Sequence, residues 1–220
     1  MKNKFQKLFT VRFYVAIGLL AAFILWTIAV CFVDVQTIGP QQSKVGLATI
    51  NAFFHECTGV NMPLYILTDW LGLVPLGFAM GFALLGAIQW IKRKRFLKVD
   101  KNLLVLGGFY IFVMAAYFFF EKAVVNYRPV LIEGVLEASY PSSTTLLVLC
   151  VIPTAMMQLC KRIKNNVLKI CVLCGMAVFV VFMVTSRFLA GVHWFSDIIG
   201  GGLLSAGLVM LYSSICKIFE

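Results

Sequence analysis

The chain has 220 residues, of which 61% are hydrophobic and 13% are charged, and its formal net charge is +10. A soluble domain is usually about 45–50% apolar and about 25% charged, so this composition excludes a soluble globular domain, a disordered chain and a disulfide-rich scaffold. The basic residues do not form one exposed face, which argues against nucleic acid as a partner. We therefore expect an integral membrane protein.

Six segments are long and apolar enough to cross a bilayer, which needs about 20 residues of helix for a hydrocarbon core of about 30 Å. They predict an all-α integral membrane protein, a six-transmembrane-helix bundle with a single membrane domain over residues 1–220. An outer loop is expected over residues 34–68. In chain order, the expected spans are residues 13–33, 70–91, 102–120, 138–160, 167–186 and 198–216.

Basic residues set the expected orientation, because Lys and Arg beside span ends remain in the cytoplasm. With six spans, 15 of the 19 Lys and Arg residues fall on one side. We therefore expect both termini in the cytoplasm and a multi-pass protein of the cell membrane. The residues left on the outer side are Lys44, Lys122, Arg128 and Arg187.

Three of these outer residues lie beside span ends, where charges are costly and are usually functional or paired. The guanidinium fork of arginine matches phosphate oxygens, so Arg128 and Arg187 predict a phosphate clamp. Ser142 and Ser143 follow Pro141 at an expected helix start, where unpaired N–H groups and hydroxyls favour an anion. Together these residues predict a phosphate site on the outer face.

His193 and Asp197 are four residues apart, a spacing that places both on one face of a helix. A carboxylate bonded to one ring nitrogen fixes the tautomer and makes the other nitrogen more nucleophilic. Each residue alone has a simpler explanation, such as a snorkelling arginine or an interfacial histidine. Their combination favours phosphoryl transfer through a phosphohistidine at His193.

Three motifs carry a resemblance to the type 2 phosphatidic acid phosphatase superfamily, the lipid phosphate phosphatases. The family pattern is Lys-x6-Arg-Pro, then Pro-Ser-Gly-His, then Ser-Arg-x5-His-x3-Asp, and the resemblance covers about residues 70–216. The third motif is matched in full, and the first two are matched in part. The matching residues are Arg128, Pro129, Pro141, Ser142, Ser186, Arg187, His193 and Asp197.

The resemblance implies a helical bundle with an outer-facing site that uses no metal and no cofactor. It implies that His193 is the nucleophile and Asp197 its orienting partner. It also implies that Arg128, Arg187 and the Ser142–Ser143 segment bind phosphate.

The chain departs from the family at two positions. The family lysine falls on Glu121, and Lys122 is one residue late, a rotation of about 100° on a helix. The long side chain of Lys122 keeps it a candidate phosphate ligand; the alternative is an interfacial pair with Glu121. The family histidine that protonates the leaving group is Thr144, which can bind substrate through its hydroxyl but is no useful general acid.

The missing acid affects the expected substrate. General acid catalysis is worth about 10²–10⁴-fold, so its loss should slow attack on a simple phosphate monoester. A diphosphate releases a phosphate monoester whose second pKa is about 6, and this group departs without a proton. We therefore expect a polyprenyl (undecaprenyl-like) diphosphate as the favoured substrate, in a bacterial plasma membrane.

Other interpretations stay open at this stage. The chain is either an active hydrolase, a catalytically impaired relative that binds lipid phosphate headgroups, or a lipid phosphotransferase. His55 is a weak candidate for the missing acid, and Glu137 is expected to face solvent or pair with an arginine. Apolar residues of the outer loop, such as Phe53 and Tyr65, suggest contact with membrane lipids at the substrate entrance.

Overall fold

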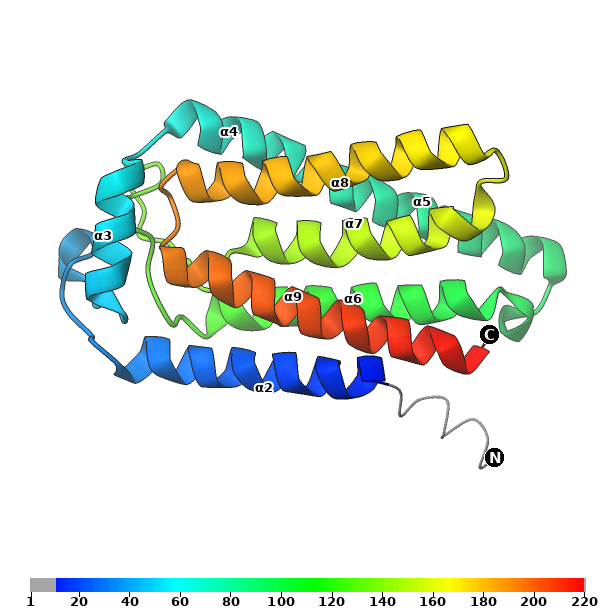
Figure 1. Ribbon diagram of the computed structural model, residues 1–220, viewed down its shortest axis with the longest axis horizontal. Coiled ribbons are helices and arrows are strands. Elements are labelled where there is room, and N and C mark those ends of the chain that lie inside the picture. Colours follow the sequence, from blue (N-terminus) through cyan, green and yellow to red (C-terminus); the bar gives the residue numbers. More distant parts are fainter. Residues whose placement is uncertain (1–10, 220) are drawn as a thin grey trace.

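The computed structural model describes residues 11–219, which are helical and contain isolated bridges but no strand. Six helices are long and apolar enough to cross a membrane, so the predicted fold class is confirmed. Figure 1 shows them as a bundle along the long axis of the molecule. The basic residues Lys2, Lys4 and Lys7, on which the expected orientation depends in part, lie outside the described residues.

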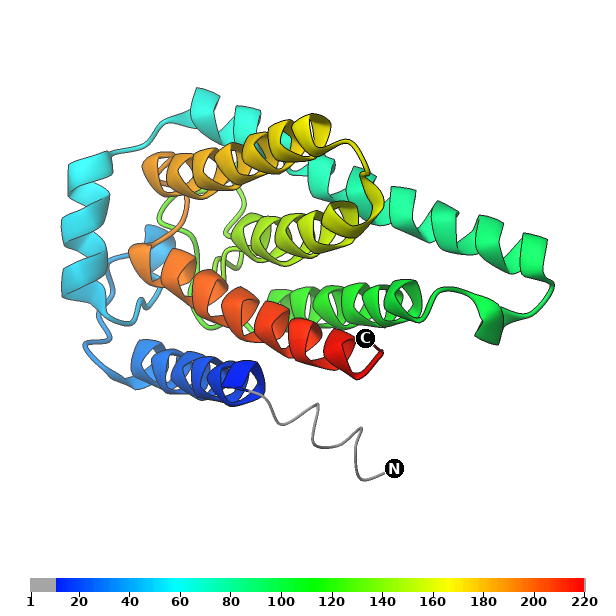
Figure 2. The same cartoon turned by 45° about the vertical axis from the view of Figure 1, so that its right-hand side comes forward.

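The helices follow one another as an antiparallel bundle with one short helix, α3 (Ala48–Thr58), lying across an end (Figure 1). The second span is made of two helices that meet at Gly72. The membrane-length elements are α2 (Val11–Phe32), α4 (Met62–Leu71) with α5 (Leu73–Arg93), α6 (Lys101–Lys122), α7 (Ser143–Arg162), α8 (Asn166–Leu189) and α9 (Phe195–Cys216). In Figure 2, α5 diverges from the rest of the bundle.

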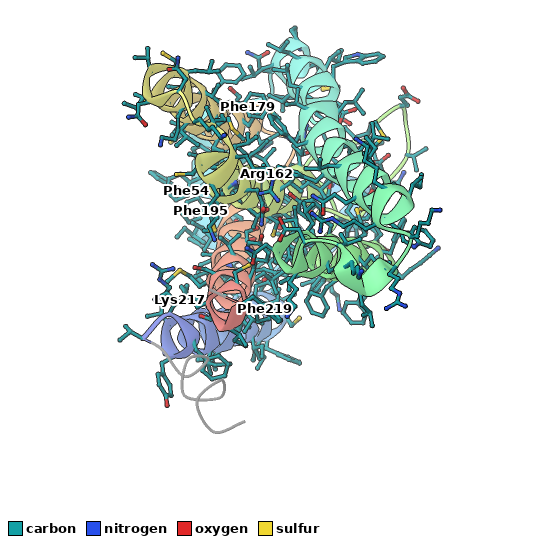
Figure 3. The ribbon with its side chains drawn as sticks, turned by 90° about the vertical axis from the view of Figure 1, so that its right-hand side faces the viewer. Phe54, Arg162, Phe179, Phe195, Lys217 and Phe219 are labelled. Carbon is teal, nitrogen blue, oxygen red and sulfur yellow. The ribbon has the colours of Figure 1, made fainter. Side chains whose placement is uncertain are left out.

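Helices α7 and α9 form the centre of the bundle. In each, 56% of the most apolar stretch is buried, compared with 11–17% in the other four spans. Helix α9 packs against α2 and α7, and α7 packs against α8 and α5. The end-on view in Figure 3 shows these helices around one axis, with Arg162 between them and Lys217 at the end of α9. The starts of α7 and α9, the two most buried helices, are therefore held firmly by the helices around them.

Close helix contact holds the bundle together, because lipid is as apolar as the core and gives little hydrophobic drive for association. Gly200 in α9 lies against Tyr140, and a Cβ there would be 2.6 Å from the ring. Gly200 therefore permits close packing without interrupting the helix. At the opposite end, Arg162 forms an ion pair of 3.0 Å with Asp100.

The second span begins earlier than residue 70, the expected start. Asn61 caps α4, since its side-chain oxygen accepts from the Leu64 N–H at 3.0 Å. A proline, Pro63, follows in the first turn, where its missing N–H costs no hydrogen bond. The expected outer loop 34–68 is therefore largely folded and includes α3 and most of α4.

The fourth span begins at Ser143 instead of residue 138, the expected start. Residues 138–142 are pinned in a non-helical path: Ser139 N donates to Asn126 O at 2.9 Å, and Ser142 N donates to Asp197 O at 3.1 Å. The other four spans begin and end within three residues of the expected bounds.

Helix α3 is fastened over one end of the bundle. The buried Asn51 side chain accepts from Ser196 N at 3.0 Å and donates to Ser196 Oγ at 2.9 Å. Phe54 stacks on Phe195 with ring centroids 4.2 Å apart. These contacts place the outer segment directly above the start of α9, at the end that holds His193. We call this the His193 end.

Candidate active site

His193 lies in the tight turn between α8 and α9. The turn requires glycine at Gly191, where φ is +65° and a Cβ would lie 1.8 Å from the Gly59 carbonyl oxygen. The Asn61 N–H donates to Ala190 O at 3.0 Å and joins this turn to the α3–α4 connection. The His193 side chain is thereby held in the interior, with 4% of the residue exposed.

The two ring nitrogens of His193 have different surroundings. Nδ1 is 3.1 Å from the Ser139 carbonyl oxygen. Nε2 is 3.2 Å from Arg187 Nη2 and 3.5 Å from Arg128 Nη1. A carbonyl oxygen only accepts and a guanidinium only donates, so Nδ1 carries the proton and Nε2 presents a lone pair. This is the tautomer that a nucleophile at Nε2 needs.

The protonation state of His193 follows from the same surroundings. Burial lowers its pKa well below the ordinary histidine value, and the charges of Arg128 and Arg187 lower it further. The hydrogen bond to Ser139 acts in the opposite direction and is outweighed. The imidazole is therefore neutral at physiological pH.

Asp197 does not contact His193 in the way the spacing predicted. Its Oδ2 lies 3.9 Å from His193 Nδ1, which is too far for a hydrogen bond. The same oxygen accepts from Ser139 Oγ at 2.7 Å and from Trp194 N at 2.8 Å. The reason is that α9 begins at Phe195, so His193 precedes the helix and the four-residue periodicity does not apply. Asp197 holds Ser139 and caps α9, and the Ser139 carbonyl orients the imidazole.

Arg187 is almost fully enclosed, with 1% of the residue exposed. Its Nη1 is 3.3 Å from Thr68 Oγ1 and 3.9 Å from Asp69 Oδ1, both of which belong to α4. Its Nε has no hydrogen-bond partner within residues 11–219. A buried guanidinium with an unmet donor is costly, and an anion in contact with it would offset that cost.

Arg128 reaches the same point from the segment after α6. Its Nε lies 3.0 Å from Glu137 Oε2, so one of the two arrangements expected for Glu137 is the one observed. The Tyr65 ring lies under both guanidinium groups, 5.9 Å from that of Arg128 and 5.0 Å from that of Arg187. The structure thus brings the two predicted arginines together on His193 Nε2.

Two cavities adjoin this cluster. The larger, about 470 Å³, is bordered by both arginines and by three carboxylates, those of Asp69, Glu121 and Glu137. The smaller, about 10 Å³, is bordered by His193 and Glu121. Ser143 and Glu121 border both cavities. The volume of the larger cavity is within the range of about 300–1,000 Å³ that is typical of small-molecule sites.

The three hydroxyl residues predicted to bind phosphate, Ser142, Ser143 and Thr144, have different surroundings in the structure. Ser142 is fully buried, and its Oγ accepts from Thr145 Oγ1 at 3.0 Å. Ser143 borders both cavities, whereas Thr144 borders neither. The Thr144 methyl group lies toward Gly72, 3.7 Å from where a Cβ would stand. Ser143 is therefore the hydroxyl of this segment that is placed to meet a ligand.

Lys122 does not join the site. It is exposed at the end of α6 and borders neither cavity, whereas Glu121 borders both. One residue on a helix is a turn of about 100°, and this rotation places Glu121, itself exposed, beside both cavities and directs Lys122 elsewhere. The structure thus places a carboxylate where the family pattern has a cation.

Several contributing residues were missed by the sequence analysis. Thr68 and Asp69 contact Arg187, and Ser139 links Asp197 to His193. The polar pair 68–69 at a span boundary was a usable signal, since polar side chains at membrane depth tend to be paired. Ser139 had no signal, because its role depends on a backbone carbonyl.

His55, the weak candidate for the missing acid, lies away from the cluster. His55 borders neither cavity; its ring lies 5.4 Å from that of Trp194, and burial lowers its pKa. Among residues 11–219, no group of three or more His, Cys, Asp and Glu side chains is arranged to hold a metal ion.

Comparisons with known proteins agree with this architecture. The model of the PAP2 superfamily matches residues 76–217, a range that includes both arginines and His193. A crystal structure described as the first transmembrane PAP2 type phosphatidylglycerolphosphate phosphatase from Bacillus subtilis is similar, with 20% identity and a TM-score of 0.56. The likeness covers 94% of this chain and 98% of that one, and at this identity it speaks for the fold. No curated protein matches the chain.

Proposed function

The chain belongs to the PAP2 superfamily, and we propose that it is a membrane lipid phosphate phosphatase that works through a phosphohistidine at His193. The observation that carries this proposal is the position of His193 Nε2. It lies 3.2 Å from Arg187 Nη2 and 3.5 Å from Arg128 Nη1, while Nδ1 is held by a backbone carbonyl. A neutral nucleophile between two phosphate-binding groups suits attack on phosphorus.

In the first step, the Nε2 lone pair attacks the phosphorus atom of the substrate and forms a P–N bond. The bond from phosphorus to the leaving oxygen breaks, and that oxygen keeps the electron pair. Arg128 and Arg187 donate to the non-bridging oxygens, where negative charge must be stabilised. Ser143 is placed to donate to the same group. The Nδ1–H remains on the Ser139 carbonyl and stabilises the positive charge that develops on the ring.

The leaving group sets the proposed substrate. Thr144 borders neither cavity and its hydroxyl is no useful acid, so this position supplies no proton to a departing oxygen. A lipid diphosphate tolerates this because the departing phosphate monoester needs no proton. We therefore favour a polyprenyl diphosphate over phosphatidic-acid-like monoesters.

The proposed orientation places the His193 end outside the cytoplasm and both termini inside. Clusters of basic residues flank the other ends of the spans, in residues 92–101 and 161–169. Such clusters stay in the cytoplasm during insertion. A phosphatase with this orientation acts on lipid headgroups of the outer leaflet, and a bacterial plasma membrane is the favoured location.

A second candidate function is headgroup binding without turnover. Two observations favour it: Lys122 is outside the site, and Thr144 is turned away from the cavities. Transfer of the phosphoryl group to an alcohol instead of water would use the same first step.

The test is phosphate release by the purified protein from a polyprenyl diphosphate and from phosphatidic acid. We expect release from the diphosphate to exceed release from the monoester and to vanish in His193→Ala. His55→Ala is the matched control, because His55 is the other histidine and borders neither cavity. Release that survives in His193→Ala would refute the phosphohistidine. Headgroup binding with no release from either lipid would support the second candidate.

A further inference from the structure

We propose that Glu121 is the catalytic base that activates water in the second half of the reaction, when the phosphohistidine is hydrolysed. This inference rests on the proposed function and names the residue that completes it. The first half needs no acid if the substrate is a diphosphate. The second half still needs a base, because the attacking water must lose a proton as it bonds to phosphorus.

The first argument is location. The leaving group departs on the side of phosphorus opposite Nε2, and water must attack from that side. Because Nε2 faces the arginines that border the larger cavity, departure and attack both take place there. Glu121 borders this cavity at the end of α6.

The second argument comes from comparing the three carboxylates of this cavity. Glu137 is 3.0 Å from Arg128 Nε, and Asp69 is 3.9 Å from Arg187 Nη1, so both neutralise the arginines. Within the described residues, Glu121 forms no ion pair at 4.0 Å or less. Its carboxylate is therefore the one not engaged by a guanidinium.

The third argument is the smaller cavity. Glu121 is the only one of the three carboxylates that borders it, together with His193, Ser139 and Ser143. Glu121 therefore lies beside the nucleophile as well as at the larger cavity, from which the attacking water comes.

The step balances as follows. The Glu121 carboxylate takes a proton from water while the water oxygen forms a bond to phosphorus. The P–Nε2 bond breaks and its electron pair returns to the imidazole, which regenerates neutral His193. Inorganic phosphate leaves, and Glu121 releases its proton to solvent.

The experiment measures the two half-reactions separately with a polyprenyl diphosphate. In rapid-quench assays, Glu121→Gln should release lipid monophosphate in a burst of about one per site, at the wild-type rate. Its steady-state turnover should then fall by about 10²-fold or more. Phosphohistidine should accumulate, measured as acid-labile, base-stable phosphate on the protein. Glu133→Gln, an identical change on an exposed residue outside both cavities, should behave like wild type.

Wild-type turnover in Glu121→Gln would overturn the assignment, as would an equal loss of burst rate and turnover. If the Gln variant cannot be obtained folded, Glu121→Asp decides, since it keeps a carboxylate on a shorter stem. In Glu121→Asp, a burst followed by slowed dephosphorylation supports Glu121 as the base. A burst followed by dephosphorylation at the wild-type rate refutes it. Failure of the proposed function is distinguishable, because wild type would then form no phosphohistidine.

Discussion

At the scale of single residues, the site depends on an imidazole that stays neutral among cations. Burial and two guanidinium groups oppose the charged form of His193, and a backbone carbonyl fixes its proton on Nδ1. The arginines thus have two effects. In the proposed function they bind the substrate phosphate, and their charges keep His193 unprotonated where an ordinary histidine would begin to gain a proton.

This arrangement predicts the acid limb of the pH profile. Because the His193 pKa is lowered, loss of kcat/KM through protonation of His193 should occur well below pH 6.5. Arg187→Gln removes one of the charges that lower this pKa, so its limb should move to higher pH in addition to the loss in kcat/KM. The measurement is kcat/KM against pH for both proteins on one diphosphate, which cancels the titration of the substrate. A limb that stays in place would show that the Arg187 charge does not act on His193.

The residue scale also shows where a motif and its geometry differ. His193 and Asp197 lie near each other, but 3.9 Å separates Asp197 Oδ2 from Nδ1, and the helical spacing that predicted their contact does not apply because His193 precedes the helix. The contact that orients the ring comes from the Ser139 backbone, which any residue type could supply. No inspection of side-chain types could have identified it.

At the scale of elements, α9 is a buried helix that lies very close to Tyr140, the residue two positions before Ser142. Gly200 faces the ring of Tyr140, whereas Gly202, on the same helix, has no atom within 4 Å of its Cβ position. Tyr140 directly follows Ser139 in the chain. The packing of α9 and the position of the orienting carbonyl are therefore linked.

The two glycines make a matched pair for mutation. Gly200→Ala would place a Cβ 2.6 Å from the Tyr140 ring, so we expect a lower melting temperature in detergent and lower activity. Gly202→Ala meets nothing and should be neutral or stabilising by up to about 1 kcal/mol, the helix preference of alanine over glycine. Equal melting temperatures for the two variants would show that the Gly200 contact is not needed.

The start of the fourth span differs from the expected one because tertiary hydrogen bonds outweigh the hydropathy of the segment before it. Hydropathy alone placed the start of the fourth span at residue 138. The backbone of residues 138–142 instead bonds to Asn126 and Asp197, and the helix starts at Ser143. This shift is what turns Ser143 toward the cavities.

At the scale of the whole molecule, the chain has two unlike ends. One end, which α3 crosses in Figure 1, carries His193. The other end carries Asp100, most of the described basic residues and Arg162, which is labelled in Figure 3. Such asymmetry is the physical basis for a fixed orientation in the membrane.

Native cysteines can report that orientation. Cys57 is exposed on α3 at the His193 end, and Cys160 is exposed near the Arg162 end of α7. In variants that keep one cysteine each, a membrane-impermeant maleimide should label Cys57 in intact cells and Cys160 only after permeabilisation. The reverse pattern would place His193 in the cytoplasm and refute the proposed outer-leaflet substrate.

Residue pattern was sufficient to predict the fold class and to identify Arg128, Arg187 and His193 as neighbours at one site. A helix in lipid must satisfy its own backbone, so apolar runs of sufficient length determine spans through local physics alone. Only the tertiary structure decided that Glu121 and not Lys122 faces the cavity, that Asp69 joins Arg187, and that Ser139 orients His193. Those outcomes depend on helix rotation and on loop paths, which are set by packing between residues far apart in the chain.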